Sequence, residues 1–319
     1  MRILPFLLFA CGLFGSVNEF LRWEISSGYR NDRIHWHLQN PGDNAELTYS
    51  ELNRDVEFWE NALTLKTIHR DLVFLVRGAY GTFGHGTLFQ KYANLSYATD
   101  QPDFQFNTQG WSADANGYFG YAVNLTADRT YKAILIPLIG LSGHFERLKR
   151  HGASPFESPN AVGANEYTLT SEAKPLRMSW WGVFIGGGFI IEPGGRFIFN
   201  GGYSYHWMRF RLHTGYENEL FFGSPIITQQ ITTVSLKVDE GGNHGHSGWG
   251  QIDYILNRAW RCGIGGQIHY FFSGVIATTL HNQVQTLLQS PSFVESDIAQ
   301  KLELRWITFS GWVQISREF

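Results

Sequence analysis

The sequence predicts an all-β protein, a closed antiparallel transmembrane β-barrel of about 10 strands, with short periplasmic turns and long extracellular loops. Apolar and polar residues alternate with a period of two over about ten segments, as in strands that have one apolar face. Short turns and long loops alternate as the connections between these segments. Only 17% of the residues are charged and 16% are aromatic, whereas a typical soluble domain has about 25% charged residues.

The alternating segments follow one another along the chain. We expect strands near 20–29, 52–68, 72–83, 106–125, 131–147, 176–191, 197–212, 232–256, 260–276 and 302–319. The first, fourth and fifth show the two rows clearly: Leu21, Trp23 and Ile25 against Arg22 and Glu24; Trp111, Phe119 and Tyr121 against Ser112, Asp114 and Asn116; Leu135, Ile139 and Phe145 against Lys132, His144 and Glu146.

Three of these strands carry irregular features. Pro137 in the fifth strand cannot donate to a strand ladder, which predicts a bulge there or weakens the strand. The sixth is apolar on both faces, and its three glycines at 186–188 leave the pairing uncertain. In the eighth, the sequence Asp-Glu-Gly-Gly at 239–242 predicts a bulge or kink.

The last segment shows the alternation best. Apolar residues occupy most odd positions from Ile307 to Ile315, and the chain ends on Phe319. This pattern is typical of the closing strand of a bacterial outer-membrane barrel, although this strand alone would also fit a soluble β-sandwich. Glu303 and Arg305 share the parity of the apolar row, so we expect the barrel to project beyond the membrane with a polar outer face.

The connections support closure in a membrane. Short turns fall at 69–71, 127–129, 192–195 and 257–258, and long polar loops at 31–48, 84–103, 148–174, 213–227 and 277–297. In lipid every backbone N–H and C=O needs a partner inside the protein, and a closed barrel is the sheet without edges. An even number of strands places both termini at the end with the short turns.

The N-terminus predicts a secretory signal peptide over residues 1–16, followed by the barrel over 17–319. Arg2 is a minimal positive region, residues 3–14 are apolar, and small residues follow at 15–16. The alternative is a short buried N-terminal strand. A signal peptide predicts export through the inner membrane to the bacterial outer membrane. The net charge of −3 argues against nucleic acid as a partner.

Four local motifs come in an order known from one family. Residues 50–52 resemble a Ser-x-Leu strand entry, 78–82 the end of a third strand, 177–180 a Phe-x-Met-Pro-Tyr segment and 203–208 a Lys-Tyr-Ser-Gly-Trp-Val segment. With about ten long strands, five large loops and a terminal Phe, the chain resembles the omptin family of outer-membrane proteases. A fainter likeness, without a specific motif, links it to outer-membrane barrels of chlamydia-related bacteria.

The resemblance implies a protease centre only in part. Omptins activate a water between an Asp-Asp pair after strand three and a His-Asp pair after strand seven, where a carboxylate orients the general base. This chain has no paired acids at 87–92, and only Asp100 and Asp103 follow. After strand seven it offers His213 and Glu217. These four residues are the catalytic candidates if the chain is a protease, but the sequence favours a non-enzymatic protein.

Two histidines raise a metal site as a hypothesis. His244 and His246 lie two positions apart, so their imidazoles share one strand face and could bind a transition metal. No third ligand is identifiable, and a polar, Gly-rich strand end is the favoured interpretation. We therefore expect neither a metal nor another cofactor.

Polar residues predicted to face the lumen suggest a filled interior. They are Lys132, His144, Glu146, Asp253, Gln267 and His269. Ten strands lie near the size at which side chains just fill a barrel. We expect a barrel that acts through surface loops, in adhesion or surface structure, or through a narrow lumen. The alternatives are a porin-like channel and an omptin-type endopeptidase. The expected partners are outer-membrane lipid and lipopolysaccharide, and host or surface macromolecules contacted by the loops.

Overall fold

A computed structural model describes residues 20–39, 47–82, 85–92, 104–126, 131–152, 156–157, 167–222, 228–274, 276–287 and 292–319. The predicted signal peptide lies outside these ranges and stays a prediction. Among the described residues, no helix has the length and apolar character needed to span a bilayer.

The described residues form strands joined in one sheet. The strands are β1 (Phe20–Gln39), β2 (Leu47–His69), β3 (Leu72–Thr82), β4 (Gly86–Tyr92), β5 (Phe104–Tyr121), β6 (Val123–Asn124), β7 (Lys132–His151), β8 (Phe156–Glu157), β9 (Tyr167–Ala173), β10 (Leu176–Glu192), β11 (Phe197–Phe222), β12 (Thr228–Ile255), β13 (Trp260–Phe272), β14 (Ile276–Leu287) and β15 (Ser292–Glu318). Four barrel strands are each made of two consecutive elements, which share at least one neighbouring strand: β3 with β4, β5 with β6, β9 with β10 and β13 with β14. Together with β1, β2, β7, β11, β12 and β15 they form a ten-stranded barrel. Within the described ranges, the short strand β8 pairs with β9 alone.

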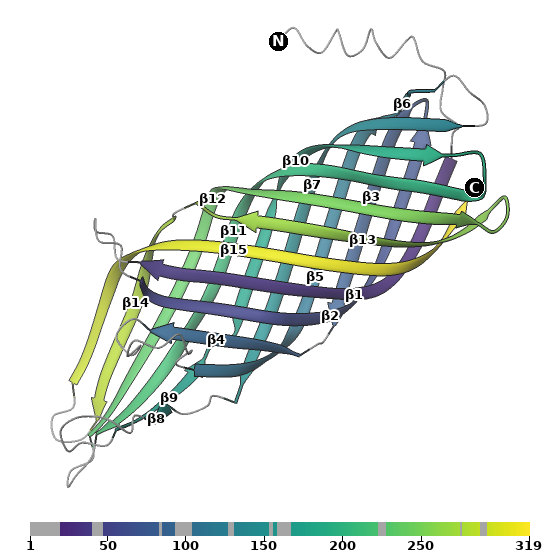
Figure 1. Cartoon of the computed structure of the whole chain (residues 1–319). Helices are drawn as coiled ribbons and strands as arrows, with labels where there is room; N and C mark the ends of the chain where they lie inside the picture. The colour runs from purple at the N-terminus through teal and green to yellow at the C-terminus, as the bar shows by residue number, and fades with distance from the viewer. Residues whose placement is uncertain are drawn as a thin grey trace, which may run out of the picture.

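The sheet closes on itself, as the sequence predicts (Figure 1). β1 pairs with β15 antiparallel over its length, from Arg22 opposite Glu318 to Gln39 opposite Lys301. Every neighbouring pair in the barrel is antiparallel, and the C-terminus lies at the end with the short turns.

Several strands extend far into stretches that we expected to be loops. β1 continues to Gln39, β11 to Phe222, and β15 begins at Ser292. The reason is that apolar and polar residues continue to alternate beyond the membrane boundary, but the apolar residues change from the outward-facing to the inward-facing positions. On β1, apolar Leu21 and Ile25 are exposed on the outer face, whereas higher up Trp36 points inward and is buried.

The turns and irregularities follow local chemistry. Arg70 and Asp71 connect β2 to β3 with positive φ angles of 50° and 67°, the pattern of a type I′ hairpin turn. The predicted irregularity at 239–242 is a bulge, because the pairing with β11 shifts between Met208 and Phe210 and Gly242 has a φ of 82°. At Pro137 pairing with β10 is continuous, and the opposite ladder is interrupted between β5 and β6 without a register shift.

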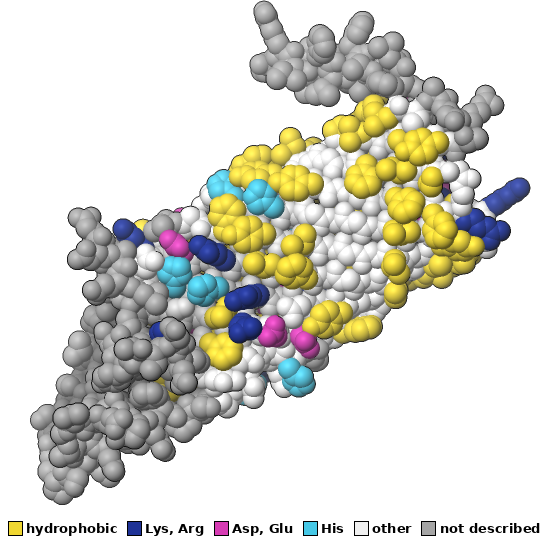
Figure 2. Space-filling view, in the orientation of Figure 1, with side chains coloured by type: hydrophobic (Ala, Val, Ile, Leu, Met, Phe, Trp, Pro, Cys, Tyr) yellow, Lys and Arg dark blue, Asp and Glu magenta, His cyan; other side chains and the backbone are white. Residues whose placement is uncertain are grey.

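The outer surface of the lower barrel is an apolar belt with aromatic residues at both margins. Exposed members at the upper margin are Tyr29, Trp59, Tyr80, Trp111, Phe145, Trp181, Trp207 and Phe309. Phe197 and Phe319 lie at the lower margin, and a tilted strand climbs about 25 Å from Phe197 to Trp207. This height matches the apolar band of an outer-membrane barrel. Histidine and charged side chains follow above the belt (Figure 2).

The interior of the upper barrel is an apolar plug. It consists of Ile34, Trp36, Leu38, Tyr49, Val56, Phe58, Leu88, Phe104, Phe106, Leu148, Leu176, Met178, Trp180, Met208, Phe210, Leu212, Leu236, Val238, Phe271, Ile276, Leu302, Leu304 and Trp306. A smaller apolar floor near the short turns consists of Ile68, Val73, Ala122, Ile134, Ile136, Ile190 and Ile198. Between plug and floor the lumen is polar. Above the membrane the barrel is therefore polar on its outer surface and apolar inside. Over much of the membrane-spanning part, the outer surface is apolar and the lumen is polar.

Candidate functional site

A layer of buried charges lies directly beneath the plug. Its centre is Arg30 on β1, which is 1% exposed. The Arg30 guanidinium donates two hydrogen bonds of 2.8 Å to the Asp32 carboxylate. It also donates to Glu60 on β2 at 3.2 Å and to Asp114 on β5. One guanidinium thus joins carboxylates from three strands, which fixes their spacing across the lumen.

His144 on β7 joins the layer from the opposite wall. Its Nδ1 lies 2.6 Å from Asp114 Oδ1, and its Nε2 lies 3.4 Å from Glu146 Oε2. The imidazole stacks on the Trp306 indole, with ring centroids 4.5 Å apart. Trp306 belongs to the plug, so the base of the plug orients the imidazole.

We call this set the ionic layer. Its members are Arg30, Asp32, Glu60, Arg77, Asp114, His144 and Glu146, with Arg77 Nη2 donating to Glu60 Oε1 at 2.7 Å. It contains four carboxylates and two guanidiniums, all largely removed from solvent. A buried charge is costly unless it is paired, so the imbalance calls for a further cation or proton.

A second ion pair crosses the plug itself. Arg150 on β7 donates to both carboxylate oxygens of Glu51 on β2, and both side chains are fully buried. The same carboxylate accepts from Trp36 Nε1 at 3.1 Å and from Gln90 Nε2 at 3.2 Å. The Glu51 carboxylate is therefore fully hydrogen-bonded, which is the condition for burying it, whereas Arg150 Nε and the indole N–H groups of Trp180 and Trp306 are buried without a partner.

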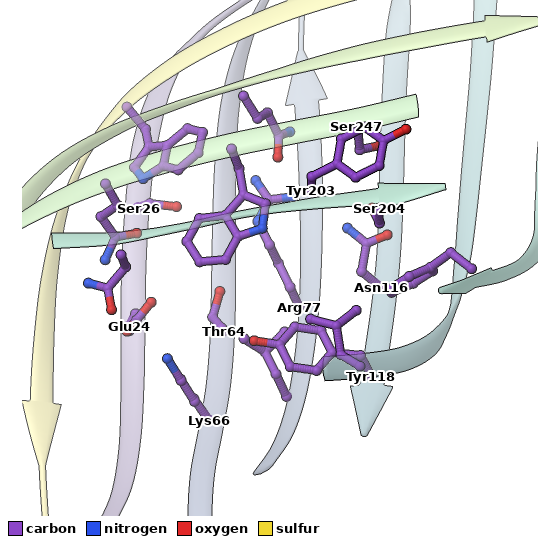
Figure 3. A pocket seen from close by; sticks show the side chains of 18 of the residues that line it. Glu24, Ser26, Thr64, Lys66, Arg77, Asn116, Tyr118, Tyr203, Ser204 and Ser247 are labelled. Atoms are coloured by element: carbon purple, nitrogen blue, oxygen red, sulfur yellow. The ribbon is translucent and has the colours of Figure 1, made fainter. Parts of the chain in front are cut away.

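A cavity of about 140 Å³ lies between the ionic layer and the floor. Glu24, Thr64, Lys66 and Tyr118 point towards it from β1, β2 and β5 (Figure 3). Its volume accommodates several water molecules. Arg77 lines it as well, so the cavity reaches the lower edge of the ionic layer.

Most residues that we predicted to face the lumen do so. His144, Glu146 and Asp253 are buried inside the barrel, and Gln267 and His269 line the cavity. Lys132 instead lies at the barrel end, with Nζ 4.0 Å from Glu192 Oε2 and a third of its side chain exposed.

The candidates drawn from the omptin resemblance are not part of this layer. His213 is exposed on the outer face of β11, opposite Arg177 and Lys237 of the neighbouring strands. Glu217, higher on β11, is half-buried. Asp100 and Asp103 fall outside the described residues.

The two histidines of the metal hypothesis lie on the outer face of β12. His244 Nδ1 is 2.9 Å from the Tyr205 hydroxyl, and His246 Nδ1 is 2.6 Å from the Tyr203 hydroxyl. Each imidazole is thus engaged by a tyrosine of β11 at the upper margin of the apolar belt.

The sequence alone does not single out three members of the ionic layer. Arg77 is not among the residues predicted to face the lumen. Asp32 falls in a predicted loop, and Glu60 is not among the candidates. Both occupy inward positions of their strands, Asp32 two residues after Arg30 and Glu60 two residues after Phe58. Continuing the alternation through the supposed loop at 31–48 would have found Asp32.

Comparison with known proteins places the chain in a family. The family described as Protochlamydia outer membrane protein (Pom) matches residues 24–310. The chain belongs to the Pom family. This confirms the fainter of the two resemblances, and with the barrel fold it makes this Pom-family protein an outer-membrane β-barrel protein. No curated protein matches the sequence.

Solved structures show the fold of this Pom-family barrel. The outer membrane protease OmpT from Escherichia coli superimposes with a TM-score of 0.63 at 11% identity, covering 96% of this chain and 98% of OmpT. The toluene transporter TodX from P. putida gives 0.33 at 9% identity, covering 95% and 91%. The translocator domain of NalP from Neisseria meningitidis gives 0.32 at 10%, covering 99% and 95%. The omptin-like architecture is confirmed, and at 11% identity the likeness extends to the fold alone.

Proposed function

We propose that this Pom-family protein is a non-enzymatic, non-conducting scaffold that presents its extracellular loops on a solid stalk above the bacterial outer membrane. The plug is the observation that supports this proposal. Trp180, Phe271 and Trp306 stack inside the upper barrel with ring centroids 4.9–5.7 Å apart. A filled stalk holds its loops at fixed spacing, so little conformational entropy is lost when they contact a large partner.

The order of layers argues against a porin. Along β1 the inward residues run from Arg22 at the cavity through Arg30 in the ionic layer to Trp36 in the plug. Along β7 they run from Ile136 in the floor through His144 to Leu148 in the plug. An ion crossing the lumen would meet buried ion pairs and then packed aromatic rings, so conduction would require the plug to open.

The outer surface supports lipid and lipopolysaccharide as partners. Arg177, Arg209, Arg211 and Lys237 are exposed on adjacent strands just above the aromatic margin of the apolar belt. Guanidinium and ammonium groups at this height are placed to pair with the phosphates of the outer leaflet. Arg209 and Arg211 both donate to Asp239, and the hydrogen bond from Arg209 lowers the pKa of the Asp239 carboxyl.

One preparation tests both halves of the proposal. We expect the refolded barrel to give no conductance steps above the lipid background in planar bilayers. We also expect beads coated with it to bind immobilised fibronectin or cultured eukaryotic cells. Replacing 93–103 and 158–166 with Gly-Ser linkers should reduce binding to the level of uncoated beads.

The matched control replaces the turn at 193–195, at the opposite end of the barrel, with a similar linker and should bind like the unaltered protein. Regular conductance steps would refute the non-conducting scaffold. Binding that survives both loop replacements, or no binding by the unaltered barrel, would refute a role in adhesion.

A further inference from the structure

Three side chains of the ionic layer are arranged as metal ligands. Asp32 on β1 and His144 and Glu146 on β7 each offer one ligand atom, and these atoms lie within 4.8 Å of one another. All three side chains are buried. We propose that they bind one Zn²⁺ ion inside the barrel, with water in the fourth position. Imidazole and carboxylate are established zinc ligands.

The distances fit an ion after small adjustments. Ligand atoms on a tetrahedral zinc ion lie about 3.4 Å apart, given bonds of about 2.1 Å. His144 Nε2 and Glu146 Oε2 are already 3.4 Å apart. The Asp32 carboxylate, whose two oxygens accept from Arg30, needs to approach by up to about 1.4 Å from the 4.8 Å limit.

The state of His144 supports a cation at this point. Asp114 Oδ1, 2.6 Å from Nδ1, can only accept, so Nδ1 carries the hydrogen. Arg30 Nη2 is 3.4 Å from the same nitrogen, too far to compete. In neutral His144 the lone pair of Nε2 therefore faces a carboxylate oxygen, and two acceptors at that distance need a proton or a metal cation between them. In metal sites, a ligating histidine commonly donates its other ring N–H to a carboxylate, which fixes the orientation of the imidazole. Asp114 has this position relative to His144.

Glu146 provides an independent observation. Its side chain is 2% exposed, and its Oε1 is buried without a hydrogen-bond partner. Leaving a buried carboxylate oxygen unsatisfied destabilises the folded state. Glu146 lies two positions from His144 on the inward face of β7, so the carboxyl group points into the proposed site. A cation bound by both carboxylate oxygens of Glu146 would satisfy Oε1 as well as Oε2.

The charges of the ionic layer match a divalent ion. Asp32, Glu60, Asp114 and Glu146 face two guanidiniums, those of Arg30 and Arg77. With His144 neutral, two negative charges remain uncompensated, and Zn²⁺ would neutralise them. The competing explanation is that protons on His144 and Glu146 take the place of the metal, and the experiment must separate the two.

The test uses the refolded full-length mature barrel, stripped of metal with a chelator. We expect calorimetric titration with ZnCl₂ to give one site per barrel and the transition temperature of unfolding to rise with Zn²⁺. X-ray absorption of the zinc-loaded protein should show a single imidazole with oxygen ligands. Glu146→Gln should abolish this site. Asp114→Asn removes no zinc ligand but weakens the hydrogen bond that orients His144 and removes a charge partner of Arg30, so it should weaken affinity about 10–100-fold.

Two controls make the result specific. His269→Gln changes another lumen histidine, and His244→Gln with His246→Gln removes the outer pair. Both should bind zinc like the unaltered barrel. The proposal fails if the unaltered barrel binds no stoichiometric zinc, if binding survives Glu146→Gln, or if the absorption spectrum shows two or more imidazoles. If Glu146→Gln does not fold, the ligand count of the unaltered barrel decides.

Discussion

Replacing Trp180 with Ala is expected to lower the free energy of unfolding by about 3–5 kcal/mol, the range for large aromatic residues removed from a packed core. Trp180 is 0% exposed. Its indole lies 4.6 Å from the Phe210 ring, 5.4 Å from Phe271 and 5.7 Å from Trp306, centroid to centroid. The plug cannot collapse around the resulting cavity, because the surrounding strands are closed into a barrel. Guanidinium chloride titration of the barrel in lipid vesicles measures the effect.

The neighbouring tryptophan is the matched control. Trp181 points outward into the apolar belt and is 48% exposed. Trp181→Ala removes the same side chain from the same strand, and we expect less than half the loss seen for Trp180→Ala. Equal losses, or a larger loss at Trp181, would mean that the upper lumen is not packed as a core.

Replacing Arg30 with Met is expected to be similarly damaging, with a loss of about 3–5 kcal/mol, because breaking a buried ion pair leaves an uncompensated charge. Arg30 is the common partner of Asp32, Glu60 and Asp114. A methionine fills much of the space but carries no charge, so three carboxylates face one another. Chemical unfolding in vesicles at neutral pH measures the loss.

Two further variants isolate the charge effect. Arg33 is exposed on the outer face of the same strand, and Arg33→Met should change stability by less than about 0.5 kcal/mol. Adding Asp32→Asn to Arg30→Met removes one of the stranded carboxylates and should recover part of the loss. A double variant that is less stable than Arg30→Met would contradict this explanation of the ionic layer.

The lower barrel could be predicted because its apolar residues face lipid. Lipid exposure imposes a strict period of two, visible in Leu21, Ile25 and Tyr29 of β1. Much of the upper barrel, including 31–39 of β1, falls in predicted loops, because the prediction keeps apolar residues on one parity along a strand. Ile34 and Trp36 continue the alternation on the other parity, since above the membrane water is outside and the core is inside.

The ionic layer could be predicted only in part. The parity of Asp114 and His144 already indicated the lumen, and Arg30 has the parity of Arg22 and Glu24, which oppose the apolar row of the first strand. Their pairing could not be derived, because β1, β5 and β7 are not all neighbours in the sheet. Which residues meet across a barrel depends on its stagger, a property of the whole closed sheet. A local pattern contains no information about it.

The barrel inverts from apolar outside to apolar inside as β11 leaves the membrane, and a fluorescence quenching scan tests this inversion most directly. Single cysteines carrying bimane replace Trp207, Phe210 and Arg211 in a Cys262→Ser background. We predict quenching of position 207 by nitroxide lipids, of 211 by iodide in the surrounding water, and of 210 by neither. Iodide quenching at position 210 equal to that at 211 would show an open, water-filled upper lumen and contradict the account.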